Sequence, residues 1–152
     1  MAVDVGDKAP DFELKDQHGT PVRLGDLRGH RVLLVFYPLA FSGICHGELC
    51  AIRDELVTSV PDDVRVLTVS VDSLFSQRAW ADKEGFTFPM LSDFWPHGEV
   101  AQAYGVFDEQ GGRALRGTFL IDGEGVVRWK EVNPVPSARD ISGYRKVLDE
   151  FS

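Results

Sequence analysis

Two largely apolar runs constrain the fold of this chain more than any other feature. Residues 31–37 read RVLLVFY and residues 64–71 read VRVLTVSV, and neither run keeps a strict alternation of apolar and polar residues. Such runs are typical of strands that are covered on both faces, as in the centre of a sheet with other elements packed on each side. Pro38 ends the first run, because proline has no amide hydrogen to donate to a sheet.

The segments around these runs carry hairpin and helix patterns. Residues 12–15 and 21–24 flank a turn-rich spacer and are predicted to form an N-terminal β-hairpin. Helices are predicted for four segments, on the basis of apolar spacing and capping residues: Ser42 to Pro61, Asp72 or Ser73 to Gly85, residues 99–104 and residues 138–151. Residues 86–98 are predicted to be a loop, and residues 115–121 and 126–130 to be strands joined by the turn sequence DGEG.

This order of elements predicts an α/β fold of the thioredoxin-like kind. Alternating strands and helices followed by an antiparallel hairpin imply a central mixed β-sheet flanked by helices, here with the N-terminal β-hairpin added. The chain has 152 residues and contains no repeat, low-complexity tract or linker. We therefore expect a single domain spanning residues 1–152.

Composition argues against several classes of function. No segment approaches the roughly 20 apolar residues of a membrane span, and residues 1–7 lack the features of a signal peptide, so a cytoplasmic location without membrane contact is expected. Sixteen basic and 24 acidic residues give a charge of −8, which disfavours a nucleic-acid partner. Two cysteines cannot form a four-thiolate zinc site, and the four histidines show no ligand spacing, so neither a metal nor another cofactor is expected.

Cys45 is the candidate reactive residue. It lies in the first turn of the helix that follows the buried strand at residues 31–37, at the sheet edge where open α/β proteins place their sites. The free amide groups and dipole of a helix N-terminus favour a thiolate over a thiol. Many cysteines are instead buried, inert packing residues. Position alone leaves both interpretations open.

The residues around Cys45 resemble a known pattern. Pro38, Ser42 and Cys45 are similar to the peroxiredoxin signature Pro-x-x-x-Thr/Ser-x-x-Cys, and Glu48 lies where many members carry an acid. Further segments resemble peroxiredoxins in the same order, so that the resemblance covers almost the whole chain: residues 8–12 (KAPDF), 88–93 (FPMLSD) and 116–122 (RGTFLID). Residues 41–45 (FSGIC) and 92–98 (SDFWPHG) are most similar to the actinobacterial alkyl hydroperoxide reductase E branch.

The resemblance implies a role for each matching residue. Cys45 corresponds to the peroxidatic cysteine, which attacks a peroxide oxygen and becomes a sulfenic acid. Ser42 corresponds to the hydroxyl that binds the peroxide and the thiolate, and Pro38 to the residue that shields the site from water. Arg116 corresponds to the distant arginine that reaches the thiolate. Without the resemblance, Arg116 could not be distinguished from any other solvated arginine at a strand end.

Cys50 and Glu48 each have two possible roles. Cys45-x-x-x-x-Cys50 has the spacing of the bacterioferritin-comigratory or Q branch, in which the second thiol resolves the sulfenic acid. On an ideal helix these Cα atoms would lie roughly 8–9 Å apart, beyond the roughly 7 Å limit for a disulfide, so this role requires unwinding. Cys50 could instead be a small packing residue. Glu48 could support the pocket or be an ordinary acid near a helix N-terminus.

The expected function is that of a thiol-dependent peroxidase acting on hydrogen peroxide, organic hydroperoxides and peroxynitrite. Electrons would return through Cys50 or an external thiol: a mycoredoxin-like or thioredoxin-like protein, or a low-molecular-weight thiol. The family resemblance also implies a homodimer. A thioredoxin-type oxidoreductase would need Cys-x-x-Cys, which this chain lacks. The alternative is a redox-sensing binding protein that is switched by oxidation of Cys45.

Overall fold

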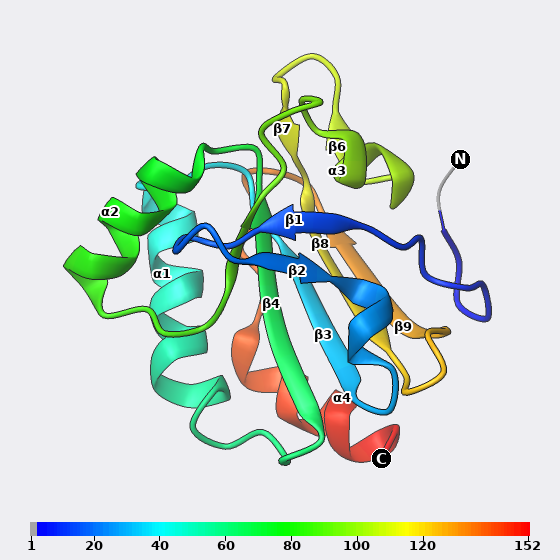
Figure 1. Cartoon of the computed structure of the whole chain (residues 1–152). Helices are drawn as coiled ribbons and strands as arrows, with labels where there is room; N and C mark the ends of the chain where they lie inside the picture. Colours follow the sequence, from blue (N-terminus) through cyan, green and yellow to red (C-terminus); the bar gives the residue numbers. More distant parts are fainter. Residues whose placement is uncertain (1–2) are drawn as a thin grey trace.

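A five-stranded mixed sheet forms the centre of the computed structural model, which describes residues 3–152 (Figure 1). Its strand order is β5-β4-β3-β8-β9. The strands are β3 (Arg31–Phe36), β4 (Val64–Ser70), β5 (Met90–Ser92), β8 (Arg116–Ile121) and β9 (Val127–Asn133). β3 pairs in parallel with β4, and β4 with β5, whereas β8 is antiparallel to both β3 and β9. The predicted thioredoxin-like mixed sheet is confirmed.

The two faces of β3 explain why its sequence does not alternate. Val35 and its neighbours at two-residue spacing pack into a cluster on one face, and Leu34 and its neighbours pack into a second cluster on the other. All six β3 residues are buried. Each central strand therefore has apolar side chains in both directions, as the two apolar runs predicted.

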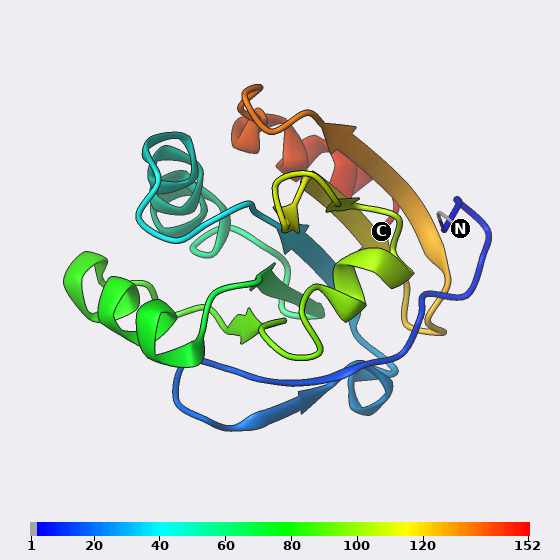
Figure 2. The same cartoon turned by 90° about the horizontal axis from the view of Figure 1, so that it is seen from above.

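Helices cover one face of the sheet, and a mixture of elements covers the other (Figure 2). On the first face lie α1 (Gly43–Ala51), the π-helical turn η2 (Ile52–Leu56), α2 (Leu74–Glu84), the 3₁₀ turn η3 (Ile141–Gly143) and α4 (Tyr144–Glu150). On the second lie the hairpin β1 (Glu13–Lys15) and β2 (Pro21–Arg23), the 3₁₀ turn η1 (Leu24–Leu27) and α3 (Glu99–Ala103). The predicted N-terminal hairpin is present, with Leu14 opposite Val22.

The predicted bounds of α2 agree with its capping chemistry. The Ser73 hydroxyl accepts a hydrogen bond from the Ser76 amide at 3.2 Å, so Ser73 rather than Asp72 is the N-cap. Gly85 ends the helix at φ +73°, a left-handed conformation that glycine adopts without strain. Within residues 3–152, no helix combines the length and apolar character that crossing a bilayer requires.

The structure corrects two of the predicted elements and adds a small sheet. The last helix does not include residues 138–140, because the Asp140 carboxylate accepts from the Ser142 amide at 3.1 Å and caps the turn that begins at Ile141. Residues 90–92 form β5 rather than loop, and this strand is too short to show a period in the sequence. The small sheet of β6 (Phe107–Asp108) and β7 (Arg113–Ala114) was not predicted.

We predict that Gln17→Ala destabilises the protein. The Gln17 side chain is buried, donates to the Phe88 carbonyl at 3.0 Å and accepts from the Met90 amide at 2.8 Å. Truncation leaves two buried backbone groups without partners, which should lower the free energy of unfolding by about 1–3 kcal/mol in urea titrations. The control is Gln110→Ala, at an exposed position, which should change it by less than about 0.5 kcal/mol.

Candidate active site

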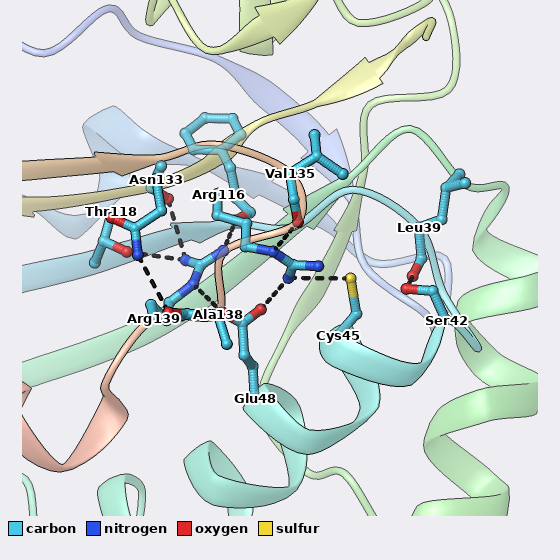
Figure 3. Close-up of polar contacts among 12 residues, drawn as sticks. Leu39, Ser42, Cys45, Glu48, Arg116, Thr118, Asn133, Val135, Ala138 and Arg139 are labelled. Atoms are coloured by element: carbon cyan, nitrogen blue, oxygen red, sulfur yellow. Dashed lines mark hydrogen bonds and ion pairs between the residues drawn. The ribbon is translucent and has the colours of Figure 1, made fainter.

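Cys45 is buried in the first turn of α1, beside the end of β3 (Figure 3). The loop that joins β3 to α1 is hydrogen-bonded to Asp72, which follows the neighbouring strand β4. The Ala40 amide donates to the Asp72 carboxylate at 2.7 Å, and the Ser70 hydroxyl donates to the same carboxylate oxygen. Phe41 has φ +67°, which is unusual for a bulky residue. The loop is therefore tightly constrained where it delivers Cys45 to the sheet edge.

A buried ion cluster lies against the Cys45 sulfur. Arg116 of β8 donates from Nη1 to Cys45 Sγ at 3.4 Å and to Glu48, and from Nε to the Val135 carbonyl at 2.7 Å. Glu48 lies one turn after Cys45 on α1, and its second carboxylate oxygen accepts from the backbone amide and Nε of Arg139 at 2.8 and 2.9 Å. Glu48 is therefore a member of the site, not a solvated helix-start acid.

Arg139 completes this cluster and was not identified from the sequence. Its guanidinium donates to the Phe36 carbonyl at the end of β3 and to the Thr118 hydroxyl of β8 at 2.9 Å. The sequence prediction placed Arg139 within a helix, whereas it lies in the loop before η3. No local pattern marks it, since its partners are 21 and more positions away along the chain.

The charges of the cluster do not cancel among its own side chains. Arg116 and Arg139 carry two positive charges, Glu48 carries one negative charge, and all three side chains are at most 3 % exposed. The cluster as a whole thus has one positive charge more than its carboxylate balances, and its Arg116 guanidinium contacts Cys45 Sγ. The Cys45 sulfur therefore lies next to a buried cluster with a net positive charge, and charges buried from water interact more strongly than at the surface.

Ser42 and Pro38 lie beside this cluster. Ser42 is at the N-cap position of α1, but its hydroxyl donates to the Leu39 carbonyl at 2.9 Å and makes no capping bond. A hydroxyl has one hydrogen to donate, and in this structure that hydrogen is used within the loop. Pro38, Ser42 and Arg116 nevertheless line one pocket of about 230 Å³, together with apolar residues that include Ile44 and Val135.

Cys50 lies on a different face of α1 from Cys45. Its sulfur is 3.5 Å from His46 Nε2, whereas the Cys45 sulfur faces Arg116, and both cysteines are free. Burial raises the pKa of the Cys50 thiol, with a smaller lowering effect from the Arg53 charge. The two thiols are therefore held apart by the folded helix, as the ideal helix geometry predicted.

We predict that Glu48→Gln destabilises the protein by about 3–5 kcal/mol, because it leaves two buried guanidinium groups without a counter-charge. Urea unfolding of the reduced protein measures this loss. The control is Glu55→Gln, which alters an exposed acid in η2 and should change the free energy of unfolding by less than about 0.5 kcal/mol. Equal stability of the two variants would contradict the proposed importance of the cluster.

Comparisons with known proteins identify the family of the chain. The profile of the AhpC/TSA family matches residues 5–130. Alkyl hydroperoxide reductase E of Mycobacterium tuberculosis is 52% identical over 139 residues, which cover 91% of each chain. Among solved structures, Enterococcus faecalis AhpC matches with a TM-score of 0.88 and 30% identity, over 99% of this chain and 93% of its own.

A second solved structure is equally informative about the fold. The reduced 2-Cys peroxiredoxin of Plasmodium vivax has a TM-score of 0.86 and 28% identity, over 97% of this chain and 81% of its own. The agreement in sequence and in backbone structure extends over nearly the whole of this chain. Together with the cysteine at the start of α1, it shows that the chain belongs to the AhpC/TSA family of peroxiredoxins.

Proposed function

We propose that Cys45 is the nucleophile through which this thiol-dependent peroxidase reduces hydroperoxides. The observation that carries the assignment is the contact of Arg116 Nη1 with Cys45 Sγ at 3.4 Å inside a buried ion cluster. Cys45 lies at the helix start and sheet edge that suit a reactive thiolate. Ser42 and Pro38, which line the adjoining pocket, are assigned to binding the peroxide and to excluding water.

The proposed reaction is a two-electron displacement. The Cys45 thiolate attacks one oxygen of R–O–O–H, so that an S–O bond forms while the O–O bond breaks. The sulfur is oxidised to a sulfenic acid, and the leaving oxygen takes up a proton to give water or an alcohol. Ionising a thiol contributes only a few-fold to such a rate, because a more acidic thiol gives a less nucleophilic thiolate.

The larger contribution is expected from stabilising charge on the leaving oxygen. Nε and Nη1 of Arg116 are engaged by Val135, Glu48 and Cys45, so we assign Nη2 as the donor to the peroxide. The Ser42 hydroxyl can rotate from Leu39 to a bound oxygen. Fixed donors aimed at developing charge are each worth on the order of a hundredfold or more in rate.

The pocket beside Cys45 supports organic hydroperoxides as the preferred substrates. It has a volume of about 230 Å³, and Leu39, Ile44 and Val135 provide apolar side chains on which an alkyl group can pack. Hydrogen peroxide has no alkyl group, so those contacts do not strengthen its binding. Peroxynitrite is included among the proposed substrates on the basis of the family resemblance alone.

We propose that the sulfenic acid is cleared by Cys50 or by an external thiol. Cys50 is five positions after Cys45, and the disulfide requires the first turns of α1 to unwind because the two thiols face different neighbours. The reductant would be a mycoredoxin-like or thioredoxin-like protein, or a low-molecular-weight thiol. A redox-sensing role for Cys45 has no specific observation in its favour, and sustained turnover with a reductant would distinguish the peroxidase from a sensor.

A cytoplasmic homodimer is the assembly that we propose. Support for self-association comes from exposed apolar side chains in the segments that follow the parallel strands β3 and β5. These side chains are Leu39, Phe41, Ile44, Phe94 and Trp95. The location is proposed from the sequence composition alone.

Replacement of Cys45 and replacement of Arg116 should have separable effects on peroxide reduction. We expect Cys45→Ser to abolish peroxide consumption, because a serine hydroxyl is not ionised at neutral pH. We expect Arg116→Lys to lower the second-order rate constant for peroxide by about a hundredfold or more, because lysine lacks the planar fork that contacts Cys45, Glu48 and Val135 together. Stopped-flow tryptophan fluorescence measures this rate.

The control for Arg116→Lys is Arg128→Lys, an exposed position on β9, which should leave the rate unchanged. Full activity in Cys45→Ser, or less than a threefold loss in Arg116→Lys, would refute the assigned roles.

The role of Cys50 is testable by intact-mass analysis after one equivalent of peroxide, in the presence of a chelator. Resolution by Cys50 predicts an internal disulfide in the wild type and a persistent sulfenic acid in Cys50→Ser, with more sulfinic acid at higher peroxide. A persistent sulfenic acid in both proteins would exclude this role and leave the external thiol.

A further inference from the structure

His46, Cys50 and Glu84 form a cluster outside the peroxide site. Their ligand-type atoms, Nε2, Sγ and a carboxylate oxygen, all lie within 4.8 Å of one another. His46 and Cys50 are four positions apart on α1 and therefore share one face of the helix, while Glu84 is the last residue of α2. Ligand spacing along the chain predicted no metal. It could not detect a group whose third member comes from another helix.

Two of the three distances in the cluster match those of a tetrahedral zinc site, and the third, between Cys50 Sγ and the Glu84 carboxylate, is at most 4.8 Å. His46 Nε2 is 3.5 Å from Cys50 Sγ and 3.2 Å from Glu84 Oε1. With ordinary zinc bonds to sulfur, nitrogen and oxygen, a tetrahedral angle places the sulfur about 3.6 Å and the oxygen about 3.4 Å from the nitrogen. Ligands that are spaced in this way require little movement to close on one cation.

The hydrogen bonds of the cluster are incomplete without a cation. Nε2 of a histidine carries at most one hydrogen, so it can donate to Glu84 or accept from Cys50, but not both at once. A divalent cation satisfies all three atoms together. An ionised Cys50 and Glu84 also supply the two negative charges that neutralise it, and histidine, thiolate and carboxylate are all common zinc ligands.

Neighbouring side chains contact two of the three ligands, His46 and Glu84. The His46 ring lies 6.5 Å from the Trp80 ring at 33°, and Arg53 lies 3.9 Å from Glu84 Oε2, the oxygen that does not face His46. Arg53 is a nearby positive charge, but it forms a double hydrogen bond with Asp54 at 2.7 and 2.9 Å. Arg53 therefore directs Glu84 Oε1 toward His46 while its own charge is largely balanced.

We propose that His46, Cys50 and Glu84 bind one Zn²⁺ ion, and that this ion controls whether Cys50 can reach Cys45. The cation would join the first turns of α1 to the end of α2. The disulfide between Cys45 and Cys50 requires those turns to unwind. Bound zinc would keep these turns helical and the Cys50 sulfur coordinated to the cation. This second part rests on the proposed resolving role of Cys50, whereas zinc binding itself does not.

Metal binding to the reduced, metal-free protein tests the first part. Zinc titration against a chromophoric chelator should give one site in the wild type, with affinity lowered at least tenfold in Cys50→Ser, His46→Ala and Glu84→Gln. The matched controls are Cys45→Ser, which removes the other thiol, and Asp82→Asn, an exposed acid on α2. Both controls should bind as the wild type does.

Cobalt distinguishes the two thiols directly. Titration with Co²⁺ should produce a thiolate charge-transfer band that is retained in Cys45→Ser and lost in Cys50→Ser. Circular dichroism of each variant verifies that it is folded. Absence of a zinc site in the wild type, equal affinity in the ligand variants, or a band that depends on Cys45 would refute the site.

The second part is tested by peroxide treatment with and without one equivalent of Zn²⁺. We expect zinc to slow formation of the internal disulfide at least fivefold and the chelator to restore it, with no effect of zinc on Glu84→Gln. If the disulfide forms at the same rate with zinc bound, the control function is wrong although the site stands. If no disulfide forms even with chelator, the resolving role of Cys50 fails instead, and with it the control function.

Discussion

The buried carboxylate of Glu48 is the group on which the arrangement of the site depends. Through it α1 is joined to Arg116 of β8 and to Arg139 of the loop before η3, and Arg139 in turn reaches the end of β3. Removing a charge from water costs several kcal/mol, which only well-placed partners offset. Because two guanidinium groups share one carboxylate, the cluster is complete only with a further negative charge, and the sulfur of Cys45 lies where that charge is needed.

The helix α1 separates two kinds of thiol chemistry by its geometry. Cys45 points to the ion cluster, whereas Cys50 points to His46 and the end of α2. The same helical turns that present Cys45 to a peroxide keep Cys50 away from it. Any exchange between the two sulfurs therefore depends on the stability of these turns, which makes the contacts between α1 and α2 relevant to how the enzyme recovers after oxidation.

Most of the fold was predictable because its signals are local. The apolar runs identified β3 and β4, Ser73 and Gly85 marked the ends of α2, and the turn between β8 and β9 lay at DGEG. The missed elements are those stabilised by distant partners. β5 has three residues and is fixed by pairing with β4 and by the Gln17 side chain, and Asp140 delays the start of the last helix by a capping bond.

Within the site, the sequence by itself determined that Cys45 begins a helix after a buried strand, and its motif with Pro38 and Ser42 indicated the peroxiredoxin family. Only the tertiary structure decided that Glu48 is buried between Arg116 and Arg139, that the Ser42 hydroxyl bonds within its loop, and that Glu84 meets His46 and Cys50. The physical reason is that propensity, capping and periodicity act between near neighbours in the chain, whereas charge compensation and ligand grouping depend on which distant residues the packed sheet and helices bring together.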